Sequence, residues 1–567
     1  MISRLPGWLS FRRECARIGS MSGLRMQRLD YLPPDYGLLL GSSAALTRDA
    51  PMRLSGAGWR TDPVSGHVFG LAPVPLTRLR YGRGFDPKAP WARSSFQWAA
   101  RVAAAQAADR EAFALWADLL SDWAGSNPPG RGINWLSPME CARRAMSLIL
   151  ASSFWWQHLV ADQGLCDWLA GLLLMHAGFV AANPEVRPGG LTTNHTSANH
   201  CGLLACASAI PHYRLSAEWK ARAADGLEGC IARQARWDGM SFEGSVPYHF
   251  YALDIFAHGA LLMKKAGIDP SRRYLDLLGG MFRFLFDVAD SRGGIPQLGD
   301  DDSGEWVTPR CAYMPAMMTT LHRAIFGSAP APRAAASSRP VSGVASLRTG
   351  GVEAVLAAIP VGQDGLGGHN HEDLLQLCLT IRGNPVLIDP GSGSYNRDLA
   401  ARSLLRSMES HNGPVPDGAP HYYSFPVGAP FDLAGAARFE TFLEASAKAG
   451  GAAAGARIEI GGRTISRSVT VTEGSVEVSD SASSGGVTVR LTLDPRWTIG
   501  PGGANNIRLF SEGEELEIET DASFRIERGP CSPKYDTVVE TAVLSMHSRT
   551  PGGLKFRIGP WVPGRQR

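Results

Sequence analysis

Three histidines and one aspartate between residues 367 and 413 have side chains that could bind a metal ion. His369 and His371 are separated by one residue, Asp389 comes eighteen residues after His371, and His411 comes twenty-two residues after Asp389. Imidazole nitrogens and carboxylate oxygens form a donor set that zinc accepts. Each histidine taken alone could equally be a polar loop residue, so the set matters only if folding brings its members together.

The residues between them predict a β-hairpin. Residues 374–381 are rich in β-forming side chains, residues 382–385 have turn chemistry, and residues 386–389 have the pattern of a returning strand. A hairpin returns the chain to the end where it began. We therefore expect His371 and Asp389 at the same end of this hairpin.

A second polar group lies around a predicted helix start. Asn194 and His195 are followed by Asn199 and His200, and an apolar run comes next. Free backbone N–H groups and the helix dipole favour an anion at such a position, so Asn199 and His200 could bind a carboxylate. Asparagine at a helix start is also a common cap with no further role.

Two more clusters contain acids and a tyrosine. Glu243 precedes Tyr248, which directly follows a proline at a predicted helix start, so its hydroxyl could face a cleft from the rim of a loop. Asp300, Asp301 and Asp302 form a run of acids without the spacing of a calcium-binding loop. We expect this run to be structural or to lie at a rim.

Together these motifs resemble the heparinase II/III-like polysaccharide lyases, a group that includes alginate and heparan lyases. The resemblance extends over about residues 90–420. It is carried by Asn199-His200, by Glu243-x-Ser245-x-x-Tyr248-His249, by His369-Asn370-His371, by Asp389-Pro390-Gly391 with Tyr395, and by Arg406 ahead of His411-Asn412.

The resemblance implies β-elimination at a uronate residue. A base removes the C5 proton, an acid protonates the departing O4, and hydrogen-bond donors neutralise the carboxylate. By resemblance, Asn199 and His200 would hold the carboxylate, and Tyr248 would be the acid. The base would be Tyr248 or His369, depending on the uronate epimer. A nearby imidazole cation or Arg406 would favour the Tyr248 phenolate.

The resemblance also implies two supporting sets of residues. One structural zinc per chain would hold loops in place without acting as a Lewis acid, and its ligands would be His371, Asp389 and His411. Substrate contacts would come from Glu243, Tyr395 and Arg406. Some alginate-cleaving members have a second tyrosine where this chain has residues 400–405. That difference argues against a two-tyrosine mechanism and against alginate as the substrate.

The elements that must position these residues predict a multidomain α+β protein. Helical spacing of apolar residues recurs from residue 91 onward, which predicts an N-terminal (α/α) toroid or, alternatively, a plain helical bundle. Alternating segments between glycine-rich turns then predict a C-terminal antiparallel β-sandwich. The expected divisions are an irregular arm (1–90), the toroid (91–326), a linker (327–343) and the β-sandwich (344–567).

Composition limits the class of protein and its partners. The 567 residues are enough for two large domains, and 44% hydrophobic with 19% charged residues is typical of globular chains. A net charge of +3 gives no overall basic field for nucleic acid. We expect an acidic polysaccharide or oligosaccharide as partner, and neither nucleic acid nor a membrane. The oligomeric state does not follow from the sequence.

Cysteine usage and the N-terminal segment bear on location. Nine cysteines without a Cys-x-x-Cys pair are typical of free thiols in a reducing compartment. No stretch has the pattern of a signal peptide or the length of a membrane span, so a cytoplasmic location is expected. A periplasmic location would follow if the chain starts elsewhere, for example at Met21.

Two other functions fit the same residues. A glycoside hydrolase on the helical scaffold would use Glu243 with Asp301 or Asp302. A non-catalytic protein of exopolysaccharide assembly would keep the cleft without turnover.

Overall fold

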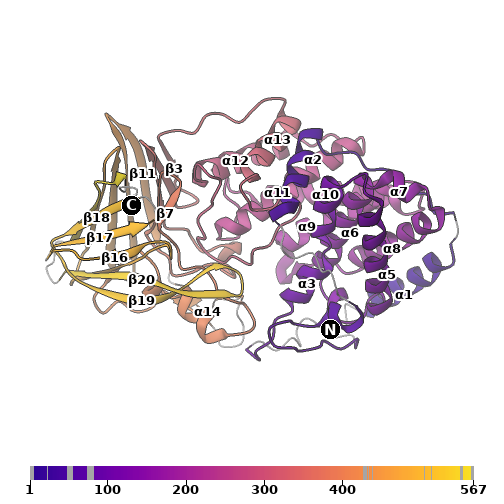
Figure 1. The fold of residues 1–567 in the computed structure, drawn as a ribbon, viewed down its shortest axis with the longest axis horizontal. Coiled ribbons are helices and arrows are strands. Elements are labelled where there is room, and N and C mark those ends of the chain that lie inside the picture. The colour runs from indigo at the N-terminus through magenta and orange to yellow at the C-terminus, as the bar shows by residue number, and fades with distance from the viewer. Residues whose placement is uncertain are drawn as a thin grey trace. The chain divides into compact units, whose positions relative to one another are not determined.

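The computed structural model describes the chain apart from residues 1–4, 22, 47–54, 73–81, 426–430, 432, 434, 437–438, 504, 512–513, 549–552 and 564–567. The chain forms two compact units, which Figure 1 colours along the sequence. The first unit comprises Met1–Ala235, Tyr251–Gly279 and Glu305–Pro330. The second comprises Arg236–Phe250, Gly280–Gly304 and Ala331–Arg567.

The first unit is helical. Helices that follow one another in sequence pack against each other, such as α8 with α9 and α9 with α10, as in an (α/α) toroid. The helical structure that apolar spacing predicted from residue 91 onward is confirmed. The helices of the chain before residue 330 are α1 (Leu5–Gly19), α2 (Pro34–Ser42), α3 (Lys88–Ser94), α4 (Gln97–Ala105), α5 (Arg110–Ser126), α6 (Pro138–Phe154), α7 (Trp156–Val160), α8 (Gln163–Ala182), α9 (Asn194–Ala209), α10 (Ser216–Gln234), α11 (Val246–Lys265), α12 (Arg272–Val288) and α13 (Met314–Phe326).

The first ninety residues differ from the expected irregular arm. Two of their segments are the helices α1 and α2, and Phe11 and Ile18 of α1 are buried. A side-chain carbon of Ile18 comes within 3.7 Å of the position that a Cβ would take at Gly171 of α8. The arm therefore belongs to the helical unit, because its apolar face packs on α8.

Helix α8 differs from the sequence-based expectation in another respect. Among the described residues it is the one helix long and apolar enough to cross a membrane by length and composition, with a mean hydropathy of 1.6 over its most apolar window. Most of that window is buried against neighbouring helices. The core helix of a folded domain has the same composition, so length and hydropathy alone do not distinguish the two cases.

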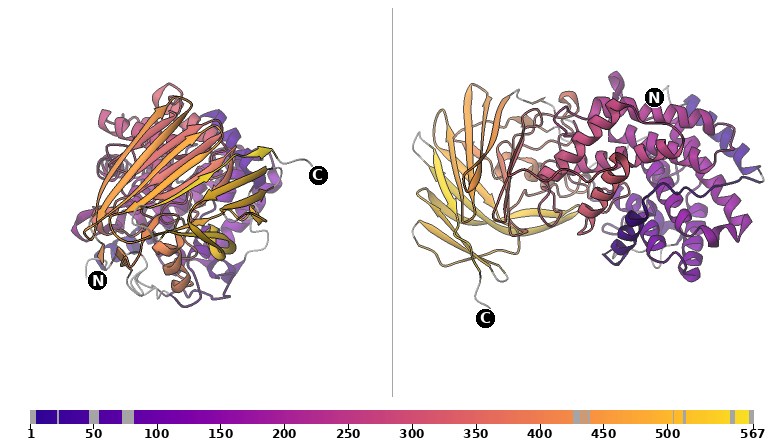
Figure 2. Two further views of the ribbon diagram at one scale, coloured as in Figure 1. Left: turned by 90° about the vertical axis from the view of Figure 1, so that its left-hand side faces the viewer. Right: turned by 90° about the horizontal axis from the view of Figure 1, so that it is seen from above.

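The second unit contains antiparallel sheets, which Figure 2 shows from two further directions. One sheet has the order β3-β4-β5-β6-β7, a second has the order β19-β20-β15-β8, and the largest runs β11-β12-β13-β14-β21-β18-β17-β16, with β22 beside β18. The strands of these three sheets are β3 (Ala336–Arg339), β4 (Val344–Thr349), β5 (Val352–Ala357), β6 (Gln376–Ile381), β7 (Asn384–Leu387), β8 (Pro414–Pro416), β11 (Glu440–Lys448), β12 (Gly451–Ile460), β13 (Arg463–Thr472), β14 (Val476–Ala482), β15 (Val487–Thr492), β16 (Thr498–Gly500), β17 (Asn506–Ser511), β18 (Glu514–Thr520), β19 (Ser523–Lys534), β20 (Thr537–Ser548), β21 (Leu554–Ile558) and β22 (Val562–Pro563).

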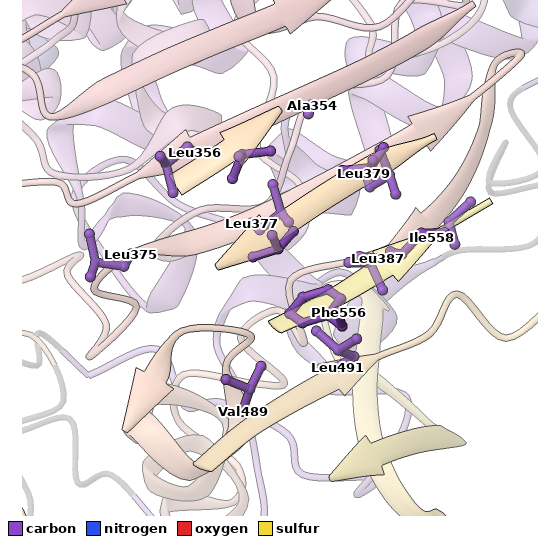
Figure 3. Close-up of a cluster of buried hydrophobic side chains, with 14 of the residues drawn as sticks. Ala354, Leu356, Leu375, Leu377, Leu379, Leu387, Val489, Leu491, Phe556 and Ile558 are labelled. Carbon is purple, nitrogen blue, oxygen red and sulfur yellow. The ribbon is translucent and has the colours of Figure 1, made fainter. Parts of the chain in front are cut away.

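Alternation of apolar and polar residues explains how these sheets make a core. In β12 and β13 every second side chain is buried, so each strand contributes one apolar face. Figure 3 shows side chains of β5, β6, β7, β15 and β21 meeting in the interior, among them Leu356, Leu377 and Leu491. This core is the scaffold on which the loops of the candidate site are fixed.

The segment expected to be a linker contains a strand. Strand β3 lies inside residues 327–343 and pairs with β4, so this segment is in part a sheet edge. The predicted hairpin is confirmed: β6 and β7 are antiparallel and joined by a tight turn. A short helix, α14 (Leu399–Arg406), and a single helical turn, η8 (Met408–Ser410), follow the hairpin and lead to His411.

Candidate functional site

Three loops of the second unit approach each other closely at two glycines. Gly244 precedes α11, and Gly299 precedes the acid run; both have positive φ angles, 80° and 72°. A Cβ on Gly299 would lie 2.8 Å from the carbonyl oxygen of His369, and one on Gly244 would lie 2.4 Å from the side chain of Asn370. Any other residue would force these loops apart, so the glycines permit the site to form.

Tyr248 lies in the first turn of α11, at the helix start that the sequence predicted. The Ser245 hydroxyl accepts a hydrogen bond from the Tyr248 backbone N–H at 3.2 Å and donates one to the carbonyl of Asp300 at 2.6 Å. Ser245 therefore orders the first helical turn and ties it to the acid run. Tyr248 itself is buried.

Tyr248, His369 and Tyr395 are in direct contact. The rings of Tyr248 and His369 are stacked, with centroids 3.7 Å apart and planes inclined by 18°. The Tyr395 hydroxyl donates a hydrogen bond to the Tyr248 hydroxyl at 3.3 Å. The structure thus places a second tyrosine, Tyr395, beside Tyr248, although residues 400–405 contain none.

Asp300 lies at the centre of this arrangement, so of the two expected positions for the acid run, structural or at a rim, Asp300 has the structural one. Its side chain is fully buried. Arg402 of α14 binds it through two parallel hydrogen bonds of 2.8 Å. Asp300 also lies 3.1 Å from Nδ1 of His369 and 3.0 Å from Nε2 of His371. One carboxylate therefore contacts a candidate base and a candidate metal ligand.

The protonation states of this group follow from its surroundings. Burial would raise the pKa of Asp300, but Arg402 and the two histidine hydrogen bonds outweigh it and hold that pKa well below the usual range. Burial raises the pKa of Tyr248 well above 10, and the carboxylates of Asp302, Asp300 and Glu243 add to this effect. The expectation that Tyr248 is favoured as a phenolate is therefore wrong, and Tyr248 is a neutral phenol.

His371, Asp389 and His411 form a group that could hold a metal ion. One ligand atom from each lies within 4.8 Å of the others, and all three residues are buried. Nε2 of His371 binds Asp300, and Nδ1 of His411 binds Asp389 at 3.1 Å. The remaining nitrogens, Nδ1 of His371 and Nε2 of His411, are buried without a hydrogen-bond partner among the described residues. Two orphaned imidazole nitrogens beside a carboxylate fit a metal ion well.

The acids proposed for a hydrolase are engaged in the loops. Both oxygens of Asp301 accept hydrogen bonds, from the Ser303 backbone N–H at 2.6 Å and from Gln297 at 3.0 Å. Glu243 is fully buried, accepts a hydrogen bond from Gln363 at 2.5 Å and lies 3.8 Å from Nε2 of His369. This arrangement holds the loops in place and does not favour a pair of hydrolytic acids.

Two arginines of α14 contribute to the site, and only one of them was predicted from the sequence. Arg406 is buried, donates to the carbonyl of Asn370 at 2.9 Å and stacks on the ring of Phe425. It thus braces the loop between His369 and His371. Arg402 was missed by the sequence analysis, and the only signal was its place four residues before Arg406, on the same face of a short helix.

Asn199 and His200 belong to the first unit and do not lie at a helix N-terminus. Helix α9 begins at Asn194, where the capping box of Thr193 and Thr196 satisfies the first backbone donors. Asn199 and His200 are in the second turn, so the expected anion site at free N–H groups is wrong. The His200 ring packs against Gly226 of α10, and burial lowers its pKa to about 4. Both amide atoms of Asn199 are buried and unpaired among the described residues.

Two family sequence models match the chain and together span most of it. Heparinase II/III N-terminus matches residues 58–308, and Heparinase II/III-like, C-terminal matches residues 331–558. No curated protein matches the chain.

Solved structures resemble the chain over nearly its whole length. A heparinase III superposes with a TM-score of 0.66 at 12% identity, covering 99% of this chain and 92% of that one. The heparan sulfate lyase HepC from Pedobacter heparinus gives a TM-score of 0.57 at 16% identity, covering 98% and 88%. At such identities the likeness concerns the fold, and it confirms a helical toroid followed by a β-sandwich.

Proposed function

Because the chain belongs to the heparinase II/III-like family, we propose that it is a polysaccharide lyase that cleaves a uronate-containing acidic polysaccharide by β-elimination. The observation that carries this proposal is the stack of Tyr248 on His369, with Tyr395 bonded to the Tyr248 hydroxyl. The reaction requires an acid and a base next to each other, because the proton leaves C5 and the oxygen leaves the adjacent C4.

In the proposed reaction His369 is the base and Tyr248 is the acid. Nε2 of His369 takes the C5 proton, the electron pair forms the C4–C5 double bond, and the C4–O4 bond breaks. The neutral phenol of Tyr248 donates its proton to O4. The hydrogen bond from Tyr395 lowers the pKa of Tyr248 against the larger effect of burial, so it stabilises the phenolate that forms at this moment.

Neutralisation of the substrate carboxylate stays a prediction for Asn199 and His200. The unpaired amide of Asn199 supports a role in ligand binding, because buried polar atoms are usually hydrogen-bonded. The contact of His200 with Gly226 favours a packing role for that ring. Of the residues expected to touch substrate, Tyr395 supports catalysis through Tyr248, while Glu243 and Arg406 act by positioning the loops.

The test of the proposed lyase is the appearance of its product. Incubation with a panel of uronate polymers should give rising ultraviolet absorbance from the unsaturated uronate end. Heparan sulfate is the first polymer to try, because a structural neighbour is described as a heparan sulfate lyase. New reducing ends without that absorbance would identify a hydrolase, and no product from any polymer would favour a non-catalytic protein.

The metal that we propose for His371, Asp389 and His411 is zinc, one ion per chain. When bound, it would join the loop before β6, the segment after β7 and the end of η8, and so contribute to folding. We expect His411→Ala to lower both zinc content and the unfolding temperature, whereas His421→Ala should leave the zinc content unchanged. His421 is a more exposed histidine of the same unit, outside the metal group. Full zinc occupancy in the His411 variant would refute the assignment.

A further inference from the structure

We propose that Asp300 is a positioning residue that fixes the tautomers of both His369 and His371, and thereby couples the base to the metal group. The inference rests on the proposed function of this site. It assigns a specific role to a residue that the sequence indicated only as structural or as part of a rim.

Every acceptor position of Asp300 is used by a donor. Oδ1 lies 2.8 Å from Nη1 of Arg402 and 3.0 Å from Nε2 of His371. Oδ2 lies 2.8 Å from Nη2 of Arg402 and 3.1 Å from Nδ1 of His369. An ionised carboxylate has about four acceptor sites and no hydrogen to donate. The two imidazole nitrogens that face it must therefore carry hydrogen.

A neutral imidazole has a single N–H group, so the position of each lone pair follows. In His369 the lone pair is on Nε2, the atom that we assign as base. In His371 it is on Nδ1, the buried nitrogen without a partner in the described part of the chain. A carboxylate that orients a metal-binding histidine through its other nitrogen is a recurring arrangement in metal sites. Here the same carboxylate also orients the base.

The Asp300 carboxylate has a fixed orientation because Arg402 donates two parallel hydrogen bonds to it. A shift of His371 on loss of metal would change the hydrogen bond at Oδ1 and so disturb the carboxylate that fixes His369. The metal can thus influence the base without touching substrate.

The isosteric variant Asp300→Asn tests this coupling. The NH₂ group of asparagine is a donor where the carboxylate oxygen was an acceptor. It would therefore face the N–H groups of Arg402 and of one histidine, and two donors cannot form a hydrogen bond with each other. The histidine at that oxygen must then move its proton to the other nitrogen or turn away. Either change blocks Nε2 of His369 or removes Nδ1 of His371 as a ligand.

The matched control is Asp480→Asn. Asp480 is also buried and is held by Arg467 through two hydrogen bonds of 2.7 and 2.8 Å, but it contacts neither histidine. Both variants weaken a buried ion pair in the same unit. Asp300→Asn changes at least one hydrogen bond to His369 or His371, whereas Asp480→Asn removes neither, so the comparison separates positioning from general destabilisation.

Full-length parent and variants would be loaded with Co²⁺ in place of the native metal, and their visible spectra and lyase kinetics compared. For Asp300→Asn we expect a changed Co²⁺ spectrum or weaker Co²⁺ binding, and a fall in kcat of about a hundredfold or more with little change in KM. Asp480→Asn should keep the parental spectrum and kcat while losing stability.

Two results would overturn the coupling: a parental spectrum and kcat in Asp300→Asn, or the same changes in Asp480→Asn. The Co²⁺ spectrum does not require turnover. If the parent cleaves no uronate polymer, the proposed lyase function fails while the spectrum still decides whether Asp300 orients His371.

Discussion

At the scale of single residues, the environment of Tyr248 decides the direction of proton transfer. Its hydroxyl is buried near the carboxylates of Asp300 and Asp302, which oppose a negative charge on the phenol. The stacked His369 ring, by contrast, can receive a proton while Asp300 supports the resulting positive charge. Acid and base roles are therefore divided between two touching rings.

Removing one hydroxyl tests the acid. We expect Tyr248→Phe to lower kcat by roughly a hundredfold to ten-thousandfold, the contribution of a general acid, with the fold and zinc content unchanged. Tyr423→Phe is the control, because Tyr423 is buried in the same unit and its hydroxyl has no hydrogen-bond partner in the described structure. Near-parental turnover by the Tyr248 variant would mean that the acid is another group.

The pH dependence of kcat separates the two roles of Tyr248. An acid must be protonated, and the pKa of Tyr248 is raised above 10, so its proton is retained throughout the neutral and mildly alkaline range. We expect kcat to stay level between about pH 8 and pH 10. A kcat that rises steadily over this interval would instead indicate a phenolate base.

At the scale of elements, helix α14 carries the arginine that holds Asp300. It has only eight residues, too few to be stable as an isolated helix, and so depends on its cap and its packing. The Asp398 carboxylate accepts hydrogen bonds of 3.0 Å from the backbone N–H groups of Ala400 and Ala401. The cap is thus part of what positions Arg402.

Removing the Asp398 cap should lower activity as well as stability. We expect Asp398→Ala to reduce stability by about 0.5–2 kcal/mol and to lower kcat/KM several-fold, because Arg402 loses its fixed position. Asp109 caps α5 of the helical unit through the same two backbone contacts. Asp109→Ala should cost a similar amount of stability and leave kcat/KM unchanged; equal losses of activity in both variants would refute the role of α14.

At the scale of the whole molecule, the two units have separate interiors, and the described Tyr248–His369 site is supported by the second. Leu491 of β15 is fully buried in the core between the sheets (Figure 3). Ile526 of β19, in the same sheet as β15, is about half exposed. These two residues provide a comparison between core and surface within one unit.

Truncation of the core should loosen the second unit. We expect Leu491→Ala to destabilise it by about 2–5 kcal/mol, from lost burial and the cavity that remains. Ile526→Ala should change stability by no more than about 0.5 kcal/mol. Hydrogen exchange of the β15 and β20 amides reports on this unit alone, and slow exchange retained in the Leu491 variant would contradict the expectation.

Local patterns in the sequence were sufficient for the elements and for several site residues. Periodic apolar residues predicted the helices from α6 to α12, and the turn between β6 and β7 predicted the hairpin that brings His371 and Asp389 together. Such features depend on neighbours within a few positions, which one sequence contains. Motif resemblance added Tyr248, His369 and the metal group. The cytoplasmic location and the carboxylate role of Asn199 stay predictions.

Only the tertiary structure decided how these parts act on one another. The contacts of Asp300 with His369 and Arg402 join segments 69 and 102 residues apart, and no local pattern encodes such a pairing. The same holds for the Tyr248 phenol, whose pKa depends on burial and on charges from distant loops. Helix α9 starts at Asn194, and Thr193 and Thr196 cap its first backbone donors, so Asn199 and His200 lie in its second turn and not at an open helix start. Burial and long-range electrostatics are properties of the folded chain, and they determine which residues are acid, base and support.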